Sequence, residues 1–215
     1  MNPAPPVTSV RTAVSYGAVF VTFEGIDGSG KSTQARLLVD ALRAEGAEVA
    51  ATREPGGTAL GERIRDLVLH GSHVAPWAEA ALYAASRAQH VDEVIRPALA
   101  RGATVVCDRY VDSSVAYQGG GRGLGIDVVL ELNLAVTGGL LPDRTILIEL
   151  DAATAVGRVG GNPDRIERDG VELMRRARDA YHLLATRFPD RYVVVDGARP
   201  VDEVAEQIAT ALGER

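Results

Sequence analysis

A glycine-rich loop between two apolar segments constrains this chain more than any other feature. Residues 25–32 read GIDGSGKS, a complete G-x-x-x-x-G-K-[ST] pattern. The β-type run 18–23 precedes it, and residues 32–45 follow with the spacing of an amphipathic helix. In this setting the glycines let backbone N–H groups curve around a polyphosphate, Lys31 reaches its outer oxygens, and Ser32 ligates Mg²⁺. The chain is therefore predicted to bind a nucleoside triphosphate.

Further runs of β-type composition recur along the chain, separated by segments with helical spacing. They span residues 48–52, 104–107, 145–150 and 192–195. This alternation predicts a parallel sheet covered by helices on both faces. Gly46 and Gly102 stand where two helices should end. Because the loops after parallel strands meet at one edge, residues 53–58, 108–123 and 196–200 are expected to lie near the glycine-rich loop.

Composition limits the size of the fold and its partners. The 215 residues, 46% of them hydrophobic, suffice for one α/β core, so residues 18–215 are predicted to form a single domain. A net charge of −6 without a run of Lys or Arg argues against a surface that coats nucleic acid. The apolar stretches are too short to cross a bilayer. The binding partners are therefore expected to be small molecules.

The N-terminal segment and the cysteine content indicate where the protein works. Residues 1–17 contain three prolines, little apolar periodicity and no signal-peptide pattern, so we expect a disordered extension. The single cysteine, Cys107, cannot form an intramolecular disulfide and lies in an apolar run, so buried packing is its expected role. Both features suit a reducing cytosol.

Two loops carry arginine where an anion would lie. Arg53 opens residues 53–58, REPGGT, whose proline and glycines fix an unusual turn after a strand; the Glu54–Pro55 bond could be cis or trans. Asp108 and Arg109 directly follow the next strand. Arg109 could clamp a phosphate while Asp108 holds Mg²⁺ water or steadies the arginine, and a solvated ion pair is the alternative. The nearby glycine-rich loop favours phosphate binding.

Four motifs in one order make the chain recognisable. They are REPGGT at 53–58, DRY at 108–110 with SS at 113–114, AYQGGGRG at 116–123, and DRIE at 164–167. In content and order they resemble the bacterial thymidylate kinases. The resemblance runs from about Val19 to the C-terminal segment.

The resemblance implies a fold and a reaction. The fold would be that of P-loop nucleoside monophosphate kinases, a three-layer α/β/α arrangement with a five-stranded parallel sheet and a short mobile lid at about residues 158–169. The reaction would be the Mg²⁺-dependent transfer of the γ-phosphoryl group of ATP to dTMP, giving ADP and dTDP for dTTP biosynthesis. A cytoplasmic homodimer without nucleic-acid or membrane partners is implied as well.

The resemblance also implies residues for the donor side. Lys31 would contact the transferred phosphoryl group, and Ser32 and Asp108 would hold Mg²⁺ directly or through water. The ATP-binding residues would be Gly25, Ile26, Asp27, Gly28, Ser29, Gly30, Lys31, Ser32 and Thr33. Asp27 would also lie near the 3′-hydroxyl of the acceptor sugar; an acid favoured by the helix dipole is the alternative.

Further residues are implied for the acceptor, dTMP. Arg53 and Arg109 would hold its phosphate and the transferring group, because a forked guanidinium suits phosphoryl oxygens. Residues 78–90 are expected to be helical, which puts Tyr83 and Arg87 on one face. The ring would stack on thymine and the guanidinium would bind its carbonyl edge. Phenylalanine is usual at the first position in the family, and without the family Tyr83 would be interpreted as a core aromatic.

The serine- and glycine-rich segment completes the implied acceptor site. Ser113, Ser114 and Gln118 would line the thymine pocket, and Tyr117 would crowd the 2′ position and favour deoxyribose. The remaining implied acceptor residues are Pro55 and Glu167. In isolation the segment also fits a flexible loop. A missing thymine methyl is worth only about 1–3 kcal/mol, so some phosphorylation of dUMP is expected.

A cation for the transition state must come from outside the glycine-rich loop, because residues 26–29 contain no arginine. Kinases of this kind supply it either from that loop or from the lid. Arg158 or Arg165 in the charged, glycine-interrupted lid is the candidate, with a solvated charge as the alternative for each. The four histidines show no metal-ligand spacing and are assigned no role.

Two other functions remain open on the sequence. A P-loop switch protein would hydrolyse ATP or GTP to control a macromolecular partner, but the chain lacks an apolar strand ending in D-x-x-G and its loops are arginine-rich. A nucleoside kinase would phosphorylate a 5′-hydroxyl and would need a carboxylate base, for which Glu24 or Asp108 could serve. Hydrolysis without added monophosphate would indicate the first, and activity on thymidine but not dTMP would indicate the second.

Overall fold

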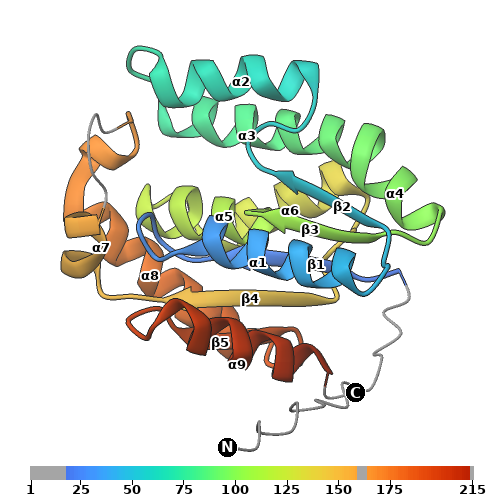
Figure 1. Ribbon diagram of the computed structural model, residues 1–215. Helices are drawn as coiled ribbons and strands as arrows, with labels where there is room; N and C mark the ends of the chain where they lie inside the picture. Colours follow the sequence, from blue (N-terminus) through green and yellow to red (C-terminus); the bar gives the residue numbers. More distant parts are fainter. Residues whose placement is uncertain (1–17, 159–163, 214–215) are drawn as a thin grey trace, which may run out of the picture.

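The computed structural model describes residues 18–158 and 164–213 (Figure 1). The expected N-terminal extension, residues 1–17, lies outside the described part, as do residues 159–163 of the expected lid. Within the described ranges, no helix is both long and apolar enough to span a bilayer.

Five parallel strands form the sheet of the described chain. They are β1 (Phe20–Glu24), β2 (Val49–Arg53), β3 (Thr104–Asp108), β4 (Arg144–Glu149) and β5 (Tyr192–Asp196), each boundary within two residues of the sequence expectation. Their order is β2-β3-β1-β4-β5, and every neighbouring pair is parallel. The chain switches direction across the sheet at β1, so a ligand crevice is expected beyond its carboxyl end. The predicted five-stranded parallel sheet is confirmed.

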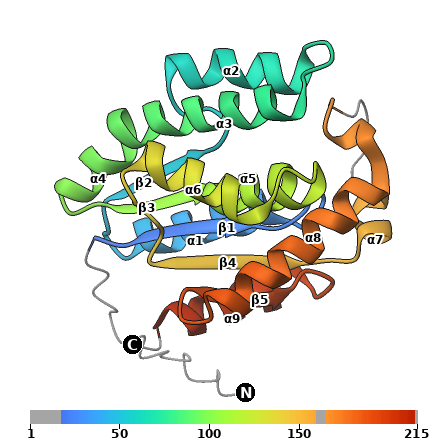
Figure 2. The same cartoon turned by 180° about the vertical axis from the view of Figure 1, so that it is seen from behind.

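Helices cover both faces of the sheet. The α-helices are α1 (Lys31–Ala44), α2 (Ala59–His70), α3 (Pro76–His90), α4 (Arg96–Ala100), α5 (Val111–Ser114), α6 (Ile126–Thr137), α7 (Ala152–Arg158), α8 (Gly170–Arg187) and α9 (Val201–Gly213). Shorter turns are the π-helical η1 (Val91–Ile95) and η2 (Val115–Gly121) and the 3₁₀ turn η3 (Glu167–Asp169). α1 and α9 lie before the sheet in Figure 1, and α5, α6 and α8 lie before it in Figure 2. The predicted three layers are confirmed, with α2 and α3 side by side beyond the β2 edge.

The apolar core fills both sides of the sheet. Phe23, Leu38 and Ile146 are buried between the sheet and the layer of α1 and α9. Phe20 and Tyr110 are buried on the other side, where their rings meet edge to face with centroids 5.0 Å apart. Burial on both faces makes the strands a rigid base for the loops at their carboxyl ends.

Glycines end two helices where the sequence indicated. Gly46 and Gly102 have φ values of 86° and 87°, in the left-handed region that side chains rarely adopt. The N–H groups of Gly46 and Ala47 donate to the carbonyls of Arg43 and Leu42, each at 3.0 Å, which closes the last turn of α1. The chain then continues into β2.

The structure settles three local points: the role of Cys107, the start of helix α3 and the isomer of the Glu54–Pro55 peptide bond. Cys107 is fully buried in β3, and its Sγ donates to the carbonyl of Arg109, so the expected packing role is confirmed. Helix α3 begins two residues earlier than expected, at Pro76. Proline suits the first position of a helix, because an N–H group there has no partner within the helix and its absence costs nothing. The Glu54–Pro55 peptide bond is cis.

Candidate active site

Two adjoining cavities lie at the carboxyl ends of β1, β2 and β3. The first, here called the loop cavity, is lined by Asp27, Gly28, Gly30, Lys31, Ser32, Thr33, Arg53, Glu54, Arg65, Asp108, Arg109 and Arg158. The second, the inner pocket, is lined by Asp27, Glu54, Pro55, Arg65, Leu69, Tyr83, Arg87, Arg109, Ser113, Ser114, Tyr117, Gln118, Asp164 and Ile166. Four residues line both, so a group bound in one cavity can approach a group bound in the other.

Backbone geometry shapes the loop cavity. Gly28 and Gly30 have φ values of 80° and 101°, and a Cβ on Gly28 would lie 2.4 Å from the carbonyl oxygen of Ala155. Glycine alone fits at residue 28 without a shift of the backbone. Helix α1 begins at Lys31, so the unpaired N–H groups of its first turn and the positive end of its dipole lie at the cavity. The loop is thus built to bind an anion.

Lys31 is held at this cavity with little solvent around it. Its Nζ donates to the carbonyl of Ile26 at 2.8 Å, and the residue is 6% exposed. Burial and the nearby charge of Arg109 lower the pKa of Lys31 to about 8. A polyphosphate beside Nζ would favour the charged form again. Lys31 therefore presents a cation whose charge an anionic ligand stabilises.

Ser32 and Asp108 fit a magnesium ion bound mainly through water and substrate. Ser32 Oγ donates to Asp108 Oδ2 at 2.5 Å, which joins the glycine-rich loop to the end of β3. The other oxygen, Asp108 Oδ1, is buried and has no hydrogen-bond partner in the described part of the chain. Mg²⁺ takes hard oxygen ligands, few of them from protein. Over the same residues, no group of three His, Cys, Asp or Glu could hold a metal by itself.

Arg109 stands where the two cavities join. Its φ is 72°, unusual for a residue with a side chain, and its N–H donates to the carbonyl of Phe23 at 2.9 Å. The guanidinium donates to Asp27 Oδ1 at 2.5 Å and to the carbonyl of Gly25 at 3.0 Å. Burial disfavours the charge, but Asp27 more than offsets this and the pKa of Arg109 stays well above its usual value. The forked cation is therefore fixed before a ligand arrives.

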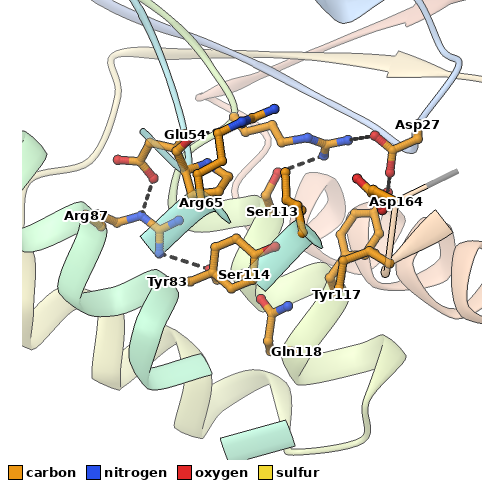
Figure 3. A pocket seen from close by; sticks show the side chains of 14 residues that line it. Asp27, Glu54, Arg65, Tyr83, Arg87, Ser113, Ser114, Tyr117, Gln118 and Asp164 are labelled. Carbon is orange, nitrogen blue, oxygen red and sulfur yellow. Dashed lines mark hydrogen bonds and ion pairs between the residues drawn. The ribbon is translucent and has the colours of Figure 1, made fainter. Parts of the chain in front are cut away.

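Asp27 is the carboxylate partner of that cation. The hydroxyl of Tyr117 donates to Asp27 Oδ2 at 2.9 Å, and the Arg109 guanidinium lies 5.3 Å from the centre of the Tyr117 ring. Burial favours the protonated form, but Arg109 and Lys31 hold the pKa of Asp27 well below its usual value. Asp27 is therefore ionised, and Figure 3 shows its side chain at the edge of the inner pocket above Tyr117.

Arg87 is buried at the inner pocket and already strongly hydrogen-bonded. It is 1% exposed. It donates to Glu54 Oε2 at 2.7 Å, to the carbonyl of Tyr110 at 2.9 Å, to Ser114 Oγ at 3.0 Å and to Asn133 Oδ1. A guanidinium has five N–H groups, so one N–H of Nη2 lacks a partner among the described residues. Arg87 can therefore serve one further acceptor from a ligand.

Flat rings and a few polar groups face the inner pocket. Figure 3 shows the rings of Tyr83, from α3, and Tyr117, from η2, together with the amide of Gln118. Apolar walls with a small number of placed polar groups are typical of a ligand pocket, and the flat rings suit a planar base. Nine of the residues predicted for dTMP line it: Asp27, Pro55, Tyr83, Arg87, Arg109, Ser113, Ser114, Tyr117 and Gln118.

The structure separates the two lid arginines. Arg158 lines the loop cavity, and its Nη1 donates to the carbonyl of Gly197 at 3.0 Å. Arg165 Nη2 donates to Glu79 Oε2 at 2.5 Å and its Nε to the carbonyl of Val68 at 2.8 Å, so it lines neither cavity. Arg158 therefore lies beside the predicted phosphates, while a buried carboxylate draws Arg165 away from them.

Other predicted residues are only partly brought together. Arg53 lines the loop cavity but not the inner pocket, and it pairs with Glu62 at 3.0 Å with a side chain 53% exposed. Six of the nine predicted ATP-binding residues line the loop cavity. The other three, Gly25, Ile26 and Ser29, do not, and Ile26 packs into the apolar core. Glu167 lies in η3, but its side chain is outside the described part.

Sequence reasoning missed five residues of the inner pocket. They are Glu54, Arg65, Leu69, Asp164 and Ile166. Glu54, Asp164 and Ile166 belong to the REPGGT and DRIE motifs, so their place in those motifs was a usable signal. Arg65, whose Nη1 donates to the carbonyl of Pro55 at 2.9 Å, lies with Leu69 on an ordinary amphipathic helix. These two carry no local signal.

Glu24, considered above as a base for a hydroxyl acceptor, is enclosed instead. It is 0% exposed and accepts hydrogen bonds from Tyr110 N at 2.7 Å, Ser113 Oγ at 2.6 Å and Tyr181 OH at 2.9 Å. Burial and the charge of Asp112 raise the pKa of Glu24 to about 7. Glu24 lines neither cavity. This enclosure gives no support to a nucleoside kinase that uses Glu24 as its base.

Comparisons with known proteins agree with this geometry. A family model described as thymidylate kinase matches residues 23–208. A thymidylate kinase of Clavibacter michiganensis is 53% identical over 196 residues, 89% of this chain and 93% of the relative. One of Deinococcus radiodurans is 48% identical over 92% of this chain and 97% of the relative. A crystal structure of thymidylate kinase from Ehrlichia chaffeensis matches with a TM-score of 0.78 at 33% identity, covering 92% of this chain and 99% of that one. The chain therefore belongs to the thymidylate kinase family.

Proposed function

We propose that this protein is a thymidylate kinase that transfers the γ-phosphoryl group of ATP to the phosphate of dTMP, forming ADP and dTDP. The observation that carries the proposal is the junction at Arg109, where an anion-binding loop cavity adjoins a pocket with flat, polar-edged walls. A phosphate at this junction is within reach of ligands in both cavities. Membership of the thymidylate kinase family supports the same reaction.

The loop cavity would hold the donor. Backbone N–H groups at the start of α1 and Nζ of Lys31 bind the polyphosphate oxygens. Ser32 and Asp108 would hold Mg²⁺, which would neutralise negative charge on the phosphates. Arg158 lines the same cavity and supplies a further cation to the transferring group. The donor is thus bound chiefly through its phosphates.

The transfer itself needs no protein base, because the dTMP phosphate is ionised at neutral pH. One of its oxygens attacks the γ-phosphorus in line, and the bond to the β,γ-bridging oxygen breaks. The protein must bring two anions together, neutralise their repulsion and exclude water. Arg109 suits this task, because Gly25 and Asp27 fix its fork at the junction, at 3.0 and 2.5 Å. Arg53, which lines the loop cavity with a more exposed side chain, adds a further cation nearby.

The inner pocket would hold the nucleoside part of dTMP. Tyr83 offers a ring face for thymine, and Arg87 offers one N–H for a base carbonyl. Tyr117 and Asp27, joined by a hydrogen bond of 2.9 Å, border the sugar. These contacts account for selection of a nucleotide with a small planar base.

The proposal is tested by measuring ADP release from ATP and Mg²⁺. dTMP, dUMP, UMP, dCMP, dAMP or thymidine is supplied in parallel, beside a reaction without acceptor. We expect a strong signal with dTMP, a weaker one with dUMP and little without acceptor. Acceptor-independent release would indicate an ATPase switch, and activity on thymidine but not dTMP would indicate a nucleoside kinase.

We also propose that residues 18–215 act as one domain and that two copies pair in the cytoplasm. Leu60, Leu67 and Trp77 of α2 and α3 are about half exposed, which supports a contact surface there. Sedimentation velocity over a range of concentrations measures the assembly. A monomer at every concentration would contradict the dimer.

A further inference from the structure

A buried carboxylate stands behind the inner pocket without lining it. Glu79 of α3 is 0% exposed and accepts a hydrogen bond from Gln118 Nε2 at 2.8 Å. Arg122 donates to both of its oxygens at 3.1 Å, and Arg165 Nη2 lies 2.5 Å from Oε2. Each carboxylate oxygen therefore receives two donors. The mechanism proposed above makes no use of this group.

The donors keep Glu79 ionised. Burial raises the pKa of a carboxyl group, but hydrogen bonds from Arg122, Gln118 and Arg165 outweigh this and lower the pKa of Glu79 below its usual value. An ionised carboxylate accepts hydrogen bonds and cannot donate them. A side-chain amide beside it must therefore present its NH₂ group.

This requirement fixes the orientation of Gln118. Its Nε2 faces Glu79, so its carbonyl oxygen, Oε1, is on the other side of the amide. Gln118 lines the inner pocket, and Figure 3 shows its amide directed into it. No described residue forms a hydrogen bond to Oε1. The pocket therefore contains an acceptor that awaits a donor from the ligand.

We propose that Glu79 is a positioning residue that holds the acceptor end of Gln118 toward the base, so that the pocket selects pyrimidines with an N3–H group. Thymine and uracil carry a hydrogen on N3, whereas cytosine carries a lone pair there. Cytosine would place that lone pair against Oε1 and leave both acceptors unsatisfied. The inference rests on the proposed function and deepens it by naming the source of base selection.

Glu79→Gln tests the proposal, because the new amide can donate. Arg122 and Arg165 will hold its oxygen, so its NH₂ group will face Gln118 and turn that amide over. The pocket will then offer a donor. We expect the ratio of the dCMP to the dTMP dissociation constant, measured by calorimetric titration, to fall about tenfold or more. The ratio of the dUMP to the dTMP constant should stay unchanged, because both bases carry N3–H.

Arg122→Gln is the matched control. It removes one ion pair with Glu79 but keeps the carboxylate and its bond to Gln118. Its dCMP to dTMP ratio should stay within about twofold of the wild-type ratio. If Glu79→Gln does not fold, the double variant E79Q/R122Q removes one negative and one positive charge together and keeps the net charge of the cluster. The double variant should show the same fall.

The outcomes separate the inference from the proposed function. Equal falls in the dCMP and dUMP ratios would mean that Glu79 only supports the packing of the pocket, and an unchanged dCMP ratio in both Glu79 variants would equally overturn the inference. Wild-type protein that neither binds nor phosphorylates dTMP would overturn the proposed function instead. A selective fall of the dCMP ratio, absent in Arg122→Gln, supports the positioning role.

Discussion

The loop cavity and the inner pocket share a wall but are built in different ways. The loop cavity draws half of its lining from one short segment, and its shape follows from the backbone at Gly28 and Gly30. The inner pocket joins side chains from α2, α3, η2 and the segment before η3. Backbone donors bind any polyphosphate, whereas packed side chains can distinguish one base from another. The proposed phosphate site is therefore local in the sequence, and the proposed choice of acceptor depends on packing.

The two regions also balance their charges differently. Arg87 forms an ion pair with Glu54 at 2.7 Å, with side chains 1% and 2% exposed. Arg53, at the loop cavity, pairs with Glu62 while both side chains are about half exposed. Breaking a buried pair leaves a charge in a medium of low polarity, whereas an exposed pair contributes little. Substitutions should therefore have unequal effects in the two regions.

Arg109→Ala should have the largest effect, because this residue serves both cavities. We expect kcat to fall about 10³-fold, as when a cation that stabilises a phosphoryl transition state is lost, with a much smaller change in the KM for ATP. Steady-state kinetics with each substrate varied in turn measure both constants. Arg109→Lys keeps the charge without the fork and should recover only part of the rate. An unchanged kcat in the alanine variant would refute the role.

Arg87→Leu should have the next largest effect. It should lower the stability of the protein but leave the loop cavity intact. It leaves Glu54 buried without its guanidinium partner and with only the His90 ring 2.9 Å from Oε1, so the free energy of unfolding should fall by about 3 kcal/mol or more. Urea unfolding measures this loss, and titration with a non-hydrolysable ATP analogue should show donor binding retained. Arg53→Leu is the control at the loop cavity, with an expected loss below about 1 kcal/mol. Equal losses in the two variants would contradict the difference between the regions.

Glu24→Gln should have a smaller effect that depends on pH. Burial raises the pKa of Glu24 to about 7, whereas an unfolded chain titrates near about 4.3. As pH rises between these values, the unfolded state releases the proton while the native state keeps it. The free energy of unfolding should therefore fall by about 3 kcal/mol across this window and level off above it.

Urea unfolding of the wild type and of Glu24→Gln at about pH 5 and about pH 7.5 measures this contribution. The variant, which cannot titrate at residue 24, should lose that part of the pH dependence. The same pH dependence in both proteins would mean that Glu24 keeps an ordinary pKa in the fold.

Tyr117→Phe should have the smallest effect. It removes the hydroxyl that donates to Asp27 at 2.9 Å but keeps the ring. Asp27 then loses one of the groups that hold it beside the proposed sugar site, so we expect the KM for dTMP to rise by about tenfold or less. The preference for dUMP over UMP, which differ only at the 2′ position, should persist if the ring crowds that position. Loss of the preference would assign the discrimination to the hydroxyl.

Local signals explain which expectations were confirmed. Short β-type runs and helix-ending glycines depend on neighbouring residues, and all five strands lie within two residues of their expected bounds. The family motifs led to Tyr83, Arg87 and Tyr117 at the inner pocket. His90 was assigned no role, but it is buried with its Nδ1 2.9 Å from Glu54 Oε1, so it supports the buried ion pair. That contact joins α3 to the turn after β2 and has no local signature.

The two lid arginines lie close together in the sequence but at different sites in the structure. Both Arg158 and Arg165 fitted a cation beside the phosphates, because the sequence places both in one charged segment. The structure brings Arg158 to the loop cavity, while Arg165 pairs with Glu79. A buried carboxylate attracts the nearest available cation strongly, since it needs a partner to remain charged. The position of Arg165 therefore depends on Glu79, a residue far from it in the sequence.

The sequence by itself determined the parallel sheet, the glycine-rich loop and the family, because each depends on adjacent residues or on motifs in a fixed order. Only the tertiary structure decided which side chains share a cavity, which arginine lines the loop cavity, and that Gln118 donates its amide hydrogen to Glu79. Those properties arise when distant groups are buried together, because desolvated charges and amides must then find partners among whichever side chains the fold brings near.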